Sequence, residues 1–398
     1  MVSTIYFTEE HQLIREQLRR FVAEQVVPFG PEWEIEGCTP RTVLRSLGEL
    51  GLLGMRFPAE YGGSDLTPLA SVVLAEELGR STFGGFAITV LVHTDMASPH
   101  LARFGTPEQL RRFLPSIVSG ERITAVAVTE PGAGSDVASI RTTARPSGDA
   151  WVLNGSKTFI TNGVHGDLYF VAARTDPAST GSRGIGMFMV ERGTKGLVVS
   201  RKLDKTGWRS SDTAELAFDE CVVPDTNLLG EPDTGFYSIM ENFQNERLVM
   251  GAMAMGEASR ALEITLEYVQ QRQAFGGTLW SKQAVRQKLA ELSAKVEAGR
   301  QLVYHTAWLY SQGEPCVKEV SMVKAYCGEL VNEVTYAGVQ FHGGYGYIRG
   351  ETIERMARDA RVHAIGGGAT EVMLEEVAKR LGGAASDRPS DRRPAHVL

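Results

Sequence analysis

The stretch that decides the fold runs from Ile123 to Gly163 and reads ITAVAVTEPGAGSDVASIRTTARPSGDAWVLNGSKTFITNG. Its first part, Ile123 to Val128, is an unbroken run of apolar or β-branched residues, which suits a buried strand and is too short for a typical helix. The bend from Thr129 to Asp136 follows directly, and its proline and glycines permit a tight turn with close backbone approach. Such a bend can present several N–H and hydroxyl donors on one side, to a flat polar heterocycle or an anionic group, although alone it also fits an ordinary turn.

A second motif, Lys157 to Gly163, lies at the end of another β-rich segment and reads KTFITNG. It places the aromatic ring of Phe159 beside the small polar side chains of Thr161 and Asn162. An aromatic ring next to hydrogen-bonding groups makes a suitable wall for a planar ring system. The two motifs together therefore favour a site for a planar, polar ligand.

Length, composition and charge limit the classes of function. The chain has 398 residues, enough for two or three domains, and its 43% hydrophobic and 22% charged residues are typical of a globular protein. A net charge of −7 argues against general nucleic-acid binding. No apolar run reaches the ~18 residues of a membrane span, and no leader is evident, so we expect a cytoplasmic protein without membrane insertion. Four cysteines without Cys-x-x-Cys spacing predict reduced thiols and no metal site.

The sequence pattern predicts an α+β protein of three domains. Residues 1–122 are expected to form a helical domain, with helical runs that include Leu69–Leu78, Phe86–Phe104 and Pro107–Val118. Residues 123–232 are expected to form a compact β-barrel or sandwich of short strands. Residues 233–383 return to helix, with apolar stripes along Val285–Tyr310 and Val323–Phe341 that face a bundle seam. The charged, proline-containing residues 384–398 are expected to be a disordered tail. The expected strands are Arg141–Ala144, Trp151–Leu153, Lys157–Thr161, Leu168–Arg174, Gly184–Glu191, Leu197–Leu203 and Thr213–Val223.

Several motifs resemble those of the acyl-CoA dehydrogenase family, and the resemblance covers almost the whole chain. Val128–Asp136 with Phe159–Gly163 resembles its flavin-binding signature, and Lys202–Leu216 resembles its last β segment. Arg272–Gly276 resembles the family's Arg-x-x-Phe-Gly, which reaches the flavin diphosphate of a neighbouring subunit, and Gln340–Tyr347 resembles its Gln-x-x-Gly-Gly-x-Gly. The resemblance implies the acyl-CoA dehydrogenase fold, with a C-terminal four-helix bundle, and bound FAD. The cofactor contacts it implies are Val128, Thr129, Gly134, Ser135, Phe159, Thr161, Arg272, Phe275, Gln340, Gly343, Gly344, Thr370 and Glu371.

The position of the catalytic base distinguishes branches of this family. Dehydrogenation of a thioester between Cα and Cβ requires a carboxylate within hydrogen-bond reach of the α-proton, in a site dry enough to raise its basicity. In the commonest branch a Glu in a loop near the C-terminus does this, but Gly367 occupies that place here. The isovaleryl- and long-chain-type branch carries its Glu on the helix after the β domain, and Glu246 in the Glu-Arg-Leu pattern matches it. An isolated helical Glu usually faces solvent, yet the absent loop carboxylate makes Glu246 the candidate base.

The resemblance also implies roles for residues near the base. The backbone N–H of Gly367 is expected to bind the thioester oxygen, so the site survives the missing side chain. Arg247 is assigned to the coenzyme A end of the substrate, and Ser135, Phe243 and Gly368 are further expected substrate contacts. The implied reaction is FAD-dependent conversion of an acyl-CoA to the trans-2-enoyl-CoA.

The implied partners are an electron-transfer flavoprotein or similar acceptor and further copies of the chain, expected as a homotetramer. Three other functions fit the same residues: an acyl-CoA oxidase, a dehydrogenase of acyl chains on a carrier protein, and a non-catalytic assembly partner that keeps the fold. The sequence leaves the length and branching of the acyl chain open.

Overall fold

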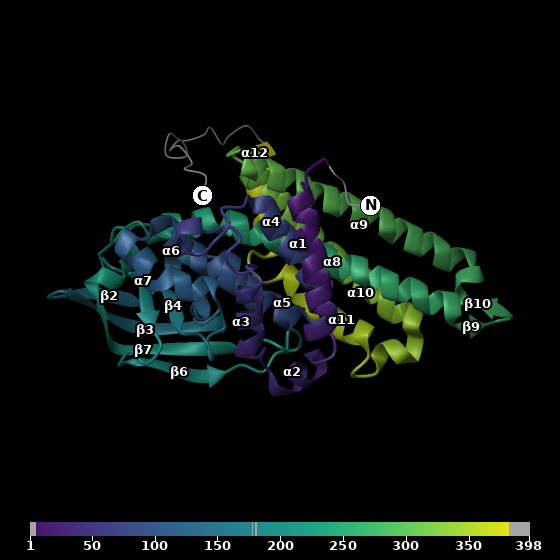
Figure 1. Ribbon diagram of the computed structural model, residues 1–398, viewed down its shortest axis with the longest axis horizontal. Helices are drawn as coiled ribbons and strands as arrows, with labels where there is room; N and C mark the ends of the chain where they lie inside the picture. The colour runs from purple at the N-terminus through teal and green to yellow at the C-terminus, as the bar shows by residue number, and fades with distance from the viewer. Residues whose placement is uncertain (1–4, 177, 180, 382–398) are drawn as a thin grey trace.

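The computed structural model describes residues 5–176, 178–179 and 181–381. Helices come first, eight strands pair into one sheet in the middle of the chain, and helices follow (Figure 1). The predicted order of a helical, a β and a second helical part is therefore confirmed. The predicted tail, 384–398, lies outside the described residues.

The N-terminal helices are built around two elements that are buried on every side. All residues of α4 (Pro68–Gly79) and of α5 (Gly84–Leu91) are buried, which fits their lack of a polar face. The helical run predicted from Phe86 to Phe104 is interrupted by a π-helical turn, η3 (Val92–Ala97), between α5 and α6. The remaining helices are α1 (Glu9–Phe21), α2 (Gly30–Glu36), α3 (Arg41–Glu49), α6 (Ser98–Phe104) and α7 (Pro107–Val118).

The strands form one hydrogen-bonded sheet in the order β6-β7-β3-β2-β4-β5-β8, and β1 pairs in parallel with β4. Two predicted strands, Trp151–Leu153 and Lys157–Thr161, are one long strand, β3, so their separation was wrong. Asn154 and Gly155, which resemble a turn, instead lie at an irregularity in the pairing of β3 with β7. The strands are β1 (Thr124–Ala127), β2 (Thr143–Ser147), β3 (Ala150–Thr161), β4 (Leu168–Arg174), β5 (Ile185–Glu191), β6 (Leu197–Lys202), β7 (Thr213–Pro224) and β8 (Leu228–Leu229).

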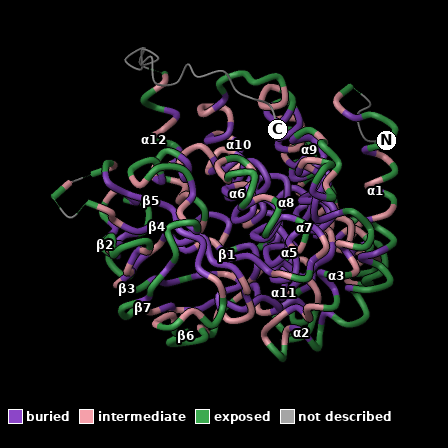
Figure 2. Tube along the Cα trace, turned by 60° about the vertical axis from the view of Figure 1, so that its left-hand side comes forward, coloured by how far each residue is buried: buried purple, intermediate pink, exposed green. Residues whose placement is uncertain are grey.

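The two faces of β4 belong to different hydrophobic cores. Leu168 and Phe170 pack with residues of α6 and α7, whereas Tyr169 and Val171 pack inside the β domain against residues of β3, β5 and β7. Successive side chains of a strand point to opposite faces, so a strand covered on both sides reads as a continuous apolar run. By contrast, β6 at the end of the sheet is largely exposed (Figure 2).

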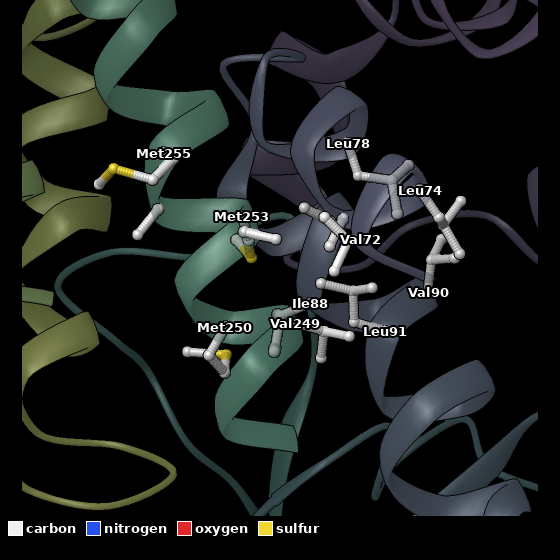
Figure 3. Packing of buried hydrophobic residues seen from close by; sticks show 14 of the residues in the cluster. Val72, Leu74, Leu78, Ile88, Val90, Leu91, Val249, Met250, Met253 and Met255 are labelled. Carbon is white, nitrogen blue, oxygen red and sulfur yellow. The ribbon is translucent and has the colours of Figure 1, made fainter. Parts of the chain in front are cut away.

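The C-terminal helices pack on one another and on the N-terminal helices. The long helix α8 (Gly235–Gln271) contacts α9 (Gln283–Ser311), α10 (Val317–His342) and α4. Figure 3 shows Val249 and Met253 of α8 beside residues of α4 and α5. Two shorter helices, α11 (Thr352–Ala360) and α12 (Thr370–Leu381), follow and both pack against α10. One core therefore joins the first and last parts of the chain.

Candidate functional site

The two motifs at the start of the β domain lie side by side. The backbone N–H of Thr158 donates to the carbonyl of Thr129 at 2.9 Å, which fixes the bend after β1 against the end of β3. The Lys157 ammonium group, fully buried, donates to the carbonyl of Val128 at 2.9 Å. The structure thus joins the start of the bend, Val128 and Thr129, to the end of β3, which carries Phe159 and Thr161, while Gly134 and Ser135 follow in the same bend.

A buried ion pair supports this bend. Glu130 binds Lys157 at 2.8 Å and also accepts hydrogen bonds from the backbone N–H groups of Arg141 and Thr142. Burial alone would raise the pKa of Glu130, but the charge of Lys157 and these hydrogen bonds hold it below its usual value. Burial lowers the pKa of Lys157 to about 8, partly opposed by Glu130. The buried pair therefore holds the two ends of the bend together. The sequence alone had assigned no role to either residue.

Phe159 has a strained and exposed conformation. Its φ is 59°, in the left-handed region, and it lies where the pairing of β3 with β7 shifts register between Lys157 and Ile160. The ring is 69% exposed. Strained backbone persists where the surrounding structure enforces it, often at ligand sites. Nearby, Gly134 and Ser135 are exposed, and a Cβ placed on Gly134 would meet nothing within 4 Å. An outward aromatic ring beside an open, donor-bearing bend fits the planar ring of a flavin.

Glu246 is a buried carboxyl group on α8. Its side chain accepts a hydrogen bond from Asn242 Nδ2 at 3.0 Å, one helical turn earlier, and only 7% of the residue is exposed. Burial raises the pKa of Glu246 to about 8, opposed by the hydrogen bond from Asn242 and the charge of Arg247. A carboxyl with a pKa near neutrality is suited to general-base chemistry.

The glycine loop before α12 lies over the same face of α8 as Glu246. A Cβ placed on Gly367 would lie 3.8 Å from Cγ of Met250, one turn after Glu246. The loop needs its glycines, because φ is 65° at Gly367 and 111° at Gly368. Lys324 of α10 holds the loop by donating to the carbonyl of Gly368 at 3.0 Å. Gly367, the predicted oxyanion donor, therefore lies against the turn of α8 that follows Glu246, the predicted base.

Arg247 points to the side of this site. Its guanidinium carbon lies 5.4 Å from the centre of the Phe243 ring, within cation–π range. A Cβ placed on Gly368 would lie 3.5 Å from Arg247 Nε. Among the described residues this buried Nε has no hydrogen-bond partner. The structure thus groups Phe243, Arg247 and Gly368, three of the predicted substrate contacts, and leaves a cationic group available.

The remaining predicted cofactor residues lie elsewhere. Arg272, Gly343 and Gly344 line a cavity of about 460 Å³ together with Tyr268 and Phe341. Phe275 is 93% exposed in the hairpin of β9 (Gln273–Ala274) and β10 (Gly277–Thr278). This hairpin and the strands β2 and β3 lie at opposite ends of the molecule (Figure 1). One chain therefore does not bring the two sets of predicted flavin contacts together.

Three other predicted cofactor residues are placed as follows. Gln340 is exposed in the last turn of α10, next to Phe341 of the cavity. Thr370 and Glu371 begin α12, directly after the glycine loop. The hydroxyl of Thr370 donates to Glu329 at 2.7 Å, while Glu371 is exposed.

Two kinds of feature are absent from the described residues. In 5–176, 178–179 and 181–381, no helix combines the length and apolarity needed to cross a membrane. Within the same ranges, no three His, Cys, Asp or Glu side chains gather in a way that could hold a metal ion.

The chain is similar to known proteins over almost its full length. Family models described as the N-terminal, middle and C-terminal domains of acyl-CoA dehydrogenase match residues 8–121, 125–221 and 233–382. The mitochondrial long-chain specific acyl-CoA dehydrogenase of Mus musculus is 40% identical over 94% of this chain and 87% of its own. The mitochondrial isovaleryl-CoA dehydrogenase of Pongo abelii is 37% identical over 92% and 87%, respectively.

Solved structures agree with these relatives. The crystal structure of an acyl-CoA dehydrogenase from Geobacillus kaustophilus superposes with a TM-score of 0.92 at 41% identity, over 95% of this chain and all of the other. The structure of a prolyl acyl carrier protein oxidase superposes with a TM-score of 0.89 at 31% identity, over 94% of this chain and all of the other.

Proposed function

The chain belongs to the acyl-CoA dehydrogenase family of FAD-dependent oxidoreductases that act on CH–CH bonds, and we propose that Glu246 is the catalytic base of this member. The observation that carries the proposal is the burial of this carboxyl on α8, with its pKa raised to about 8, beside the glycine loop. When bound, FAD supplies a hydride acceptor for the β-carbon of the substrate. Glu246 would remove the α-proton, and the product would be the trans-2-enoyl-CoA.

The other residues of the site would bind and orient the thioester. The N–H of Gly367 would donate to the thioester oxygen, where negative charge develops as the α-proton leaves. Its φ of 65° is one that glycine adopts without strain. Arg247, with its unpaired Nε, would bind an anionic or carbonyl group of coenzyme A, and Phe243, Ser135 and Gly368 would line the substrate channel.

The cofactor residues suggest an assembly. We propose that the bend and Phe159 of one chain bind the flavin ring, whereas Arg272 and Phe275 of a neighbouring chain bind its diphosphate. The reason is that, within one chain, the β9–β10 hairpin and the labelled strands β2 and β3 lie at opposite ends of the molecule. Arginine and glycine-rich backbone suit a diphosphate, and the cavity beside Arg272 provides both. The same proposal extends to a homotetramer with Thr370 and Glu371 as further flavin contacts.

The proposal also names an acceptor and a compartment. Electrons would leave through an electron-transfer flavoprotein or a similar one-electron carrier, passing the exposed Phe159. We place the protein in the cytoplasm, where thiols stay reduced, because Cys38, Cys221, Cys316 and Cys327 are all free.

The substitution Glu246→Gln tests the assignment of the base. The variant should purify with FAD, since volume and burial are almost unchanged, yet lose at least ~100-fold of the acyl-CoA-dependent bleaching of the flavin. In the parent protein the bleaching rate should rise with pH through about 8, because only the ionised carboxylate accepts the proton. Stopped-flow absorbance with butyryl-, isovaleryl-, octanoyl- and palmitoyl-CoA measures both effects. Bleaching of the variant at near the parent rate would reject Glu246 as the base.

A second candidate function is favoured by the similarity to a prolyl acyl carrier protein oxidase. An oxidase would use the same residues but would let dioxygen reach the reduced flavin. Hydrogen peroxide formed in stoichiometric amounts during aerobic turnover would support it, whereas turnover that needs an added electron acceptor would support the dehydrogenase. A parallel panel of carrier-bound thioesters identifies the acyl donor.

A further inference from the structure

Asn242 connects the proposed base to the N-terminal helices. It is buried on α8, with 8% of the residue exposed, and its Nδ2 lies 3.0 Å from Glu246 Oε1. The same nitrogen lies 2.9 Å from the carbonyl oxygen of Met96 and 3.3 Å from that of Asp95. We propose that Asn242 is a positioning residue that aims the carboxyl of Glu246 by anchoring it to the π-helical turn η3. This inference rests on the proposed role of Glu246.

The anchor exists because of the local backbone of η3. In a regular α-helix the carbonyl of Asp95 would accept from the residue four positions later, which is Pro99 and has no N–H. The Asp95 carbonyl instead accepts from Asn242 and, at 2.9 Å, from Asn245 Nδ2. A π-helical turn leaves such carbonyls free to bond outside the helix, and these turns are frequent at functional sites. The amide of Asn242 is thus held on one side and donates to the base on the other.

The charged groups near Glu246 have other partners, so they do not hold its carboxyl in place of Asn242. Arg247 follows on the same helix but is turned toward Phe243. From η3, the Asp95 carboxylate is bound by Ser71, Thr94 and Asn245, and Arg56 lies 3.9 Å from it. From α10, the Lys324 ammonium bonds to the carbonyls of His363 and Gly368. Within the described part of the chain, Asn242 is the one side chain recorded as donating to the Glu246 carboxyl.

Removing the amide should change both the aim and the basicity of Glu246. A donor that binds the ionised carboxylate favours the ionised form, so its loss makes the base titrate at higher pH. It also leaves the carboxyl free to rotate away from the substrate. We therefore expect a change in the pH profile, which a purely structural residue would not produce.

The test compares Asn242→Ala with the matched control Asn245→Ala in the FAD-loaded protein. Asn245 is buried on the same helix and binds the same Asp95 carbonyl, but it is not bonded to Glu246. With whichever of the four acyl-CoAs bleaches the parent fastest, Asn242→Ala should move the acidic limb of kcat/KM up by about one pH unit, a loss of about tenfold at pH 7. Asn245→Ala should leave the limb in place, even where it lowers the melting temperature.

An infrared titration gives a readout that does not depend on turnover. The carboxyl band that is absent from Glu246→Gln should titrate about one unit higher in Asn242→Ala than in the parent. Asn242→Asp keeps the side-chain volume and adds a negative charge next to Glu246, so it should raise the pH at which the band titrates at least as far. This variant replaces Asn242→Ala if the alanine variant does not fold. The inference would be overturned if, in a folded Asn242 variant, neither the acidic limb of kcat/KM nor the titration of the carboxyl band moved. It would also be overturned if Asn245→Ala moved them as far as Asn242→Ala does. Full activity of Glu246→Gln would instead reject the proposed function itself.

Discussion

At the scale of the residue, the main feature is the buried carboxyl group of Glu246. Among the described residues Glu246 accepts from the single donor Asn242, and it is buried from water, so its ionised form is disfavoured in the folded protein. Such a group is a stronger base than a solvent-exposed carboxylate, and the same burial makes its charge unfavourable for stability. The two effects have a common origin and can be measured separately.

The burial of Glu246 should make the stability of the protein depend on pH. The pKa of Glu246 is raised in the folded state, so between the unfolded value near 4.5 and about 8 the folded protein binds more protons at this site. This site therefore stabilises the fold less as the pH rises through that interval. The melting temperature of Glu246→Gln, relative to the parent, should increase steadily from pH 5 to pH 9, as measured by circular dichroism. Glu267→Gln, on the exposed face of the same helix, is the control, and a difference independent of pH for Glu246→Gln would contradict the expectation.

At the scale of the element, α4 and α8 approach so closely that glycines are required at the contact. A Cβ placed on Gly256 would lie 2.0 Å from the carbonyl oxygen of Glu76, and one on Gly79 would lie 2.2 Å from that of Met253. Both obstacles are backbone atoms of a buried helix, which cannot turn aside as a flexible side chain can. The position of α8, and hence of Glu246, therefore depends on this contact.

Substitution of Gly256 by alanine should force the two helices apart. Although alanine favours helix over glycine, the clash should dominate and lower the free energy of unfolding by about 1–3 kcal/mol. Urea denaturation of the purified protein measures the loss. Gly132→Ala, where the added Cβ meets nothing within 4 Å, should have a much smaller effect. A Gly256→Ala protein as stable as the parent would mean that the helices can separate without loss.

At the scale of the whole molecule, the predicted flavin contacts form two sets, one in the β domain and one around the β9–β10 hairpin, which lies at the opposite end from β2 and β3 (Figure 1). The bend and Phe159 belong to the β domain, whereas Arg272 and Phe275 lie beyond the far end of α8. If both sets bind one flavin, as proposed, each site is shared between two chains. Cofactor binding then depends on association.

Subunit mixing tests the shared site. Phe159→Asp and Arg272→Glu should each purify with little FAD, because each spoils every site of its own homo-oligomer. When the two variants are unfolded and refolded together, a hybrid pair has one site with both changes and one intact site. About a quarter of the parent's FAD binding should therefore return in a random mixture of two-fold pairs. Mixing that restores no binding, with hybrids confirmed by differently tagged chains, would argue for a site within one chain.

Much of the fold could be predicted because its patterns are local. The strand Leu168–Arg174 was predicted with its observed ends, since an apolar run covered on both faces is an unambiguous signal. The split of β3 was wrong because Asn154 and Gly155 have turn chemistry, while pairing with β7 carries the strand through them. The short helix α2 and the π-helical turn η3 were not predicted, since neither has a sequence period long enough to detect.

The candidate site was predictable only where motifs mark it. Resemblance singled out Glu246 and Gly367, and the structure places Gly367 against Met250, one turn of α8 after Glu246. Asn242, Lys324 and the Glu130–Lys157 pair were not identified, because each acts through a partner far away in the sequence. A helical Asn or a Lys in an apolar stripe carries no local sign of the carbonyl or carboxylate it will meet. Tertiary contacts alone reveal such residues.

The wide turn of η3 makes the number of residues in this helix part of the design of the site. Deleting one residue between Val92 and Ala97 would let the helix rewind regularly and would remove the wide turn that leaves its carbonyls free to bond outside the helix. The carbonyls that hold Asn242 would then face a different direction, although no residue in contact with substrate had been altered. Variation in this part of the protein is therefore constrained first in length and only then in composition.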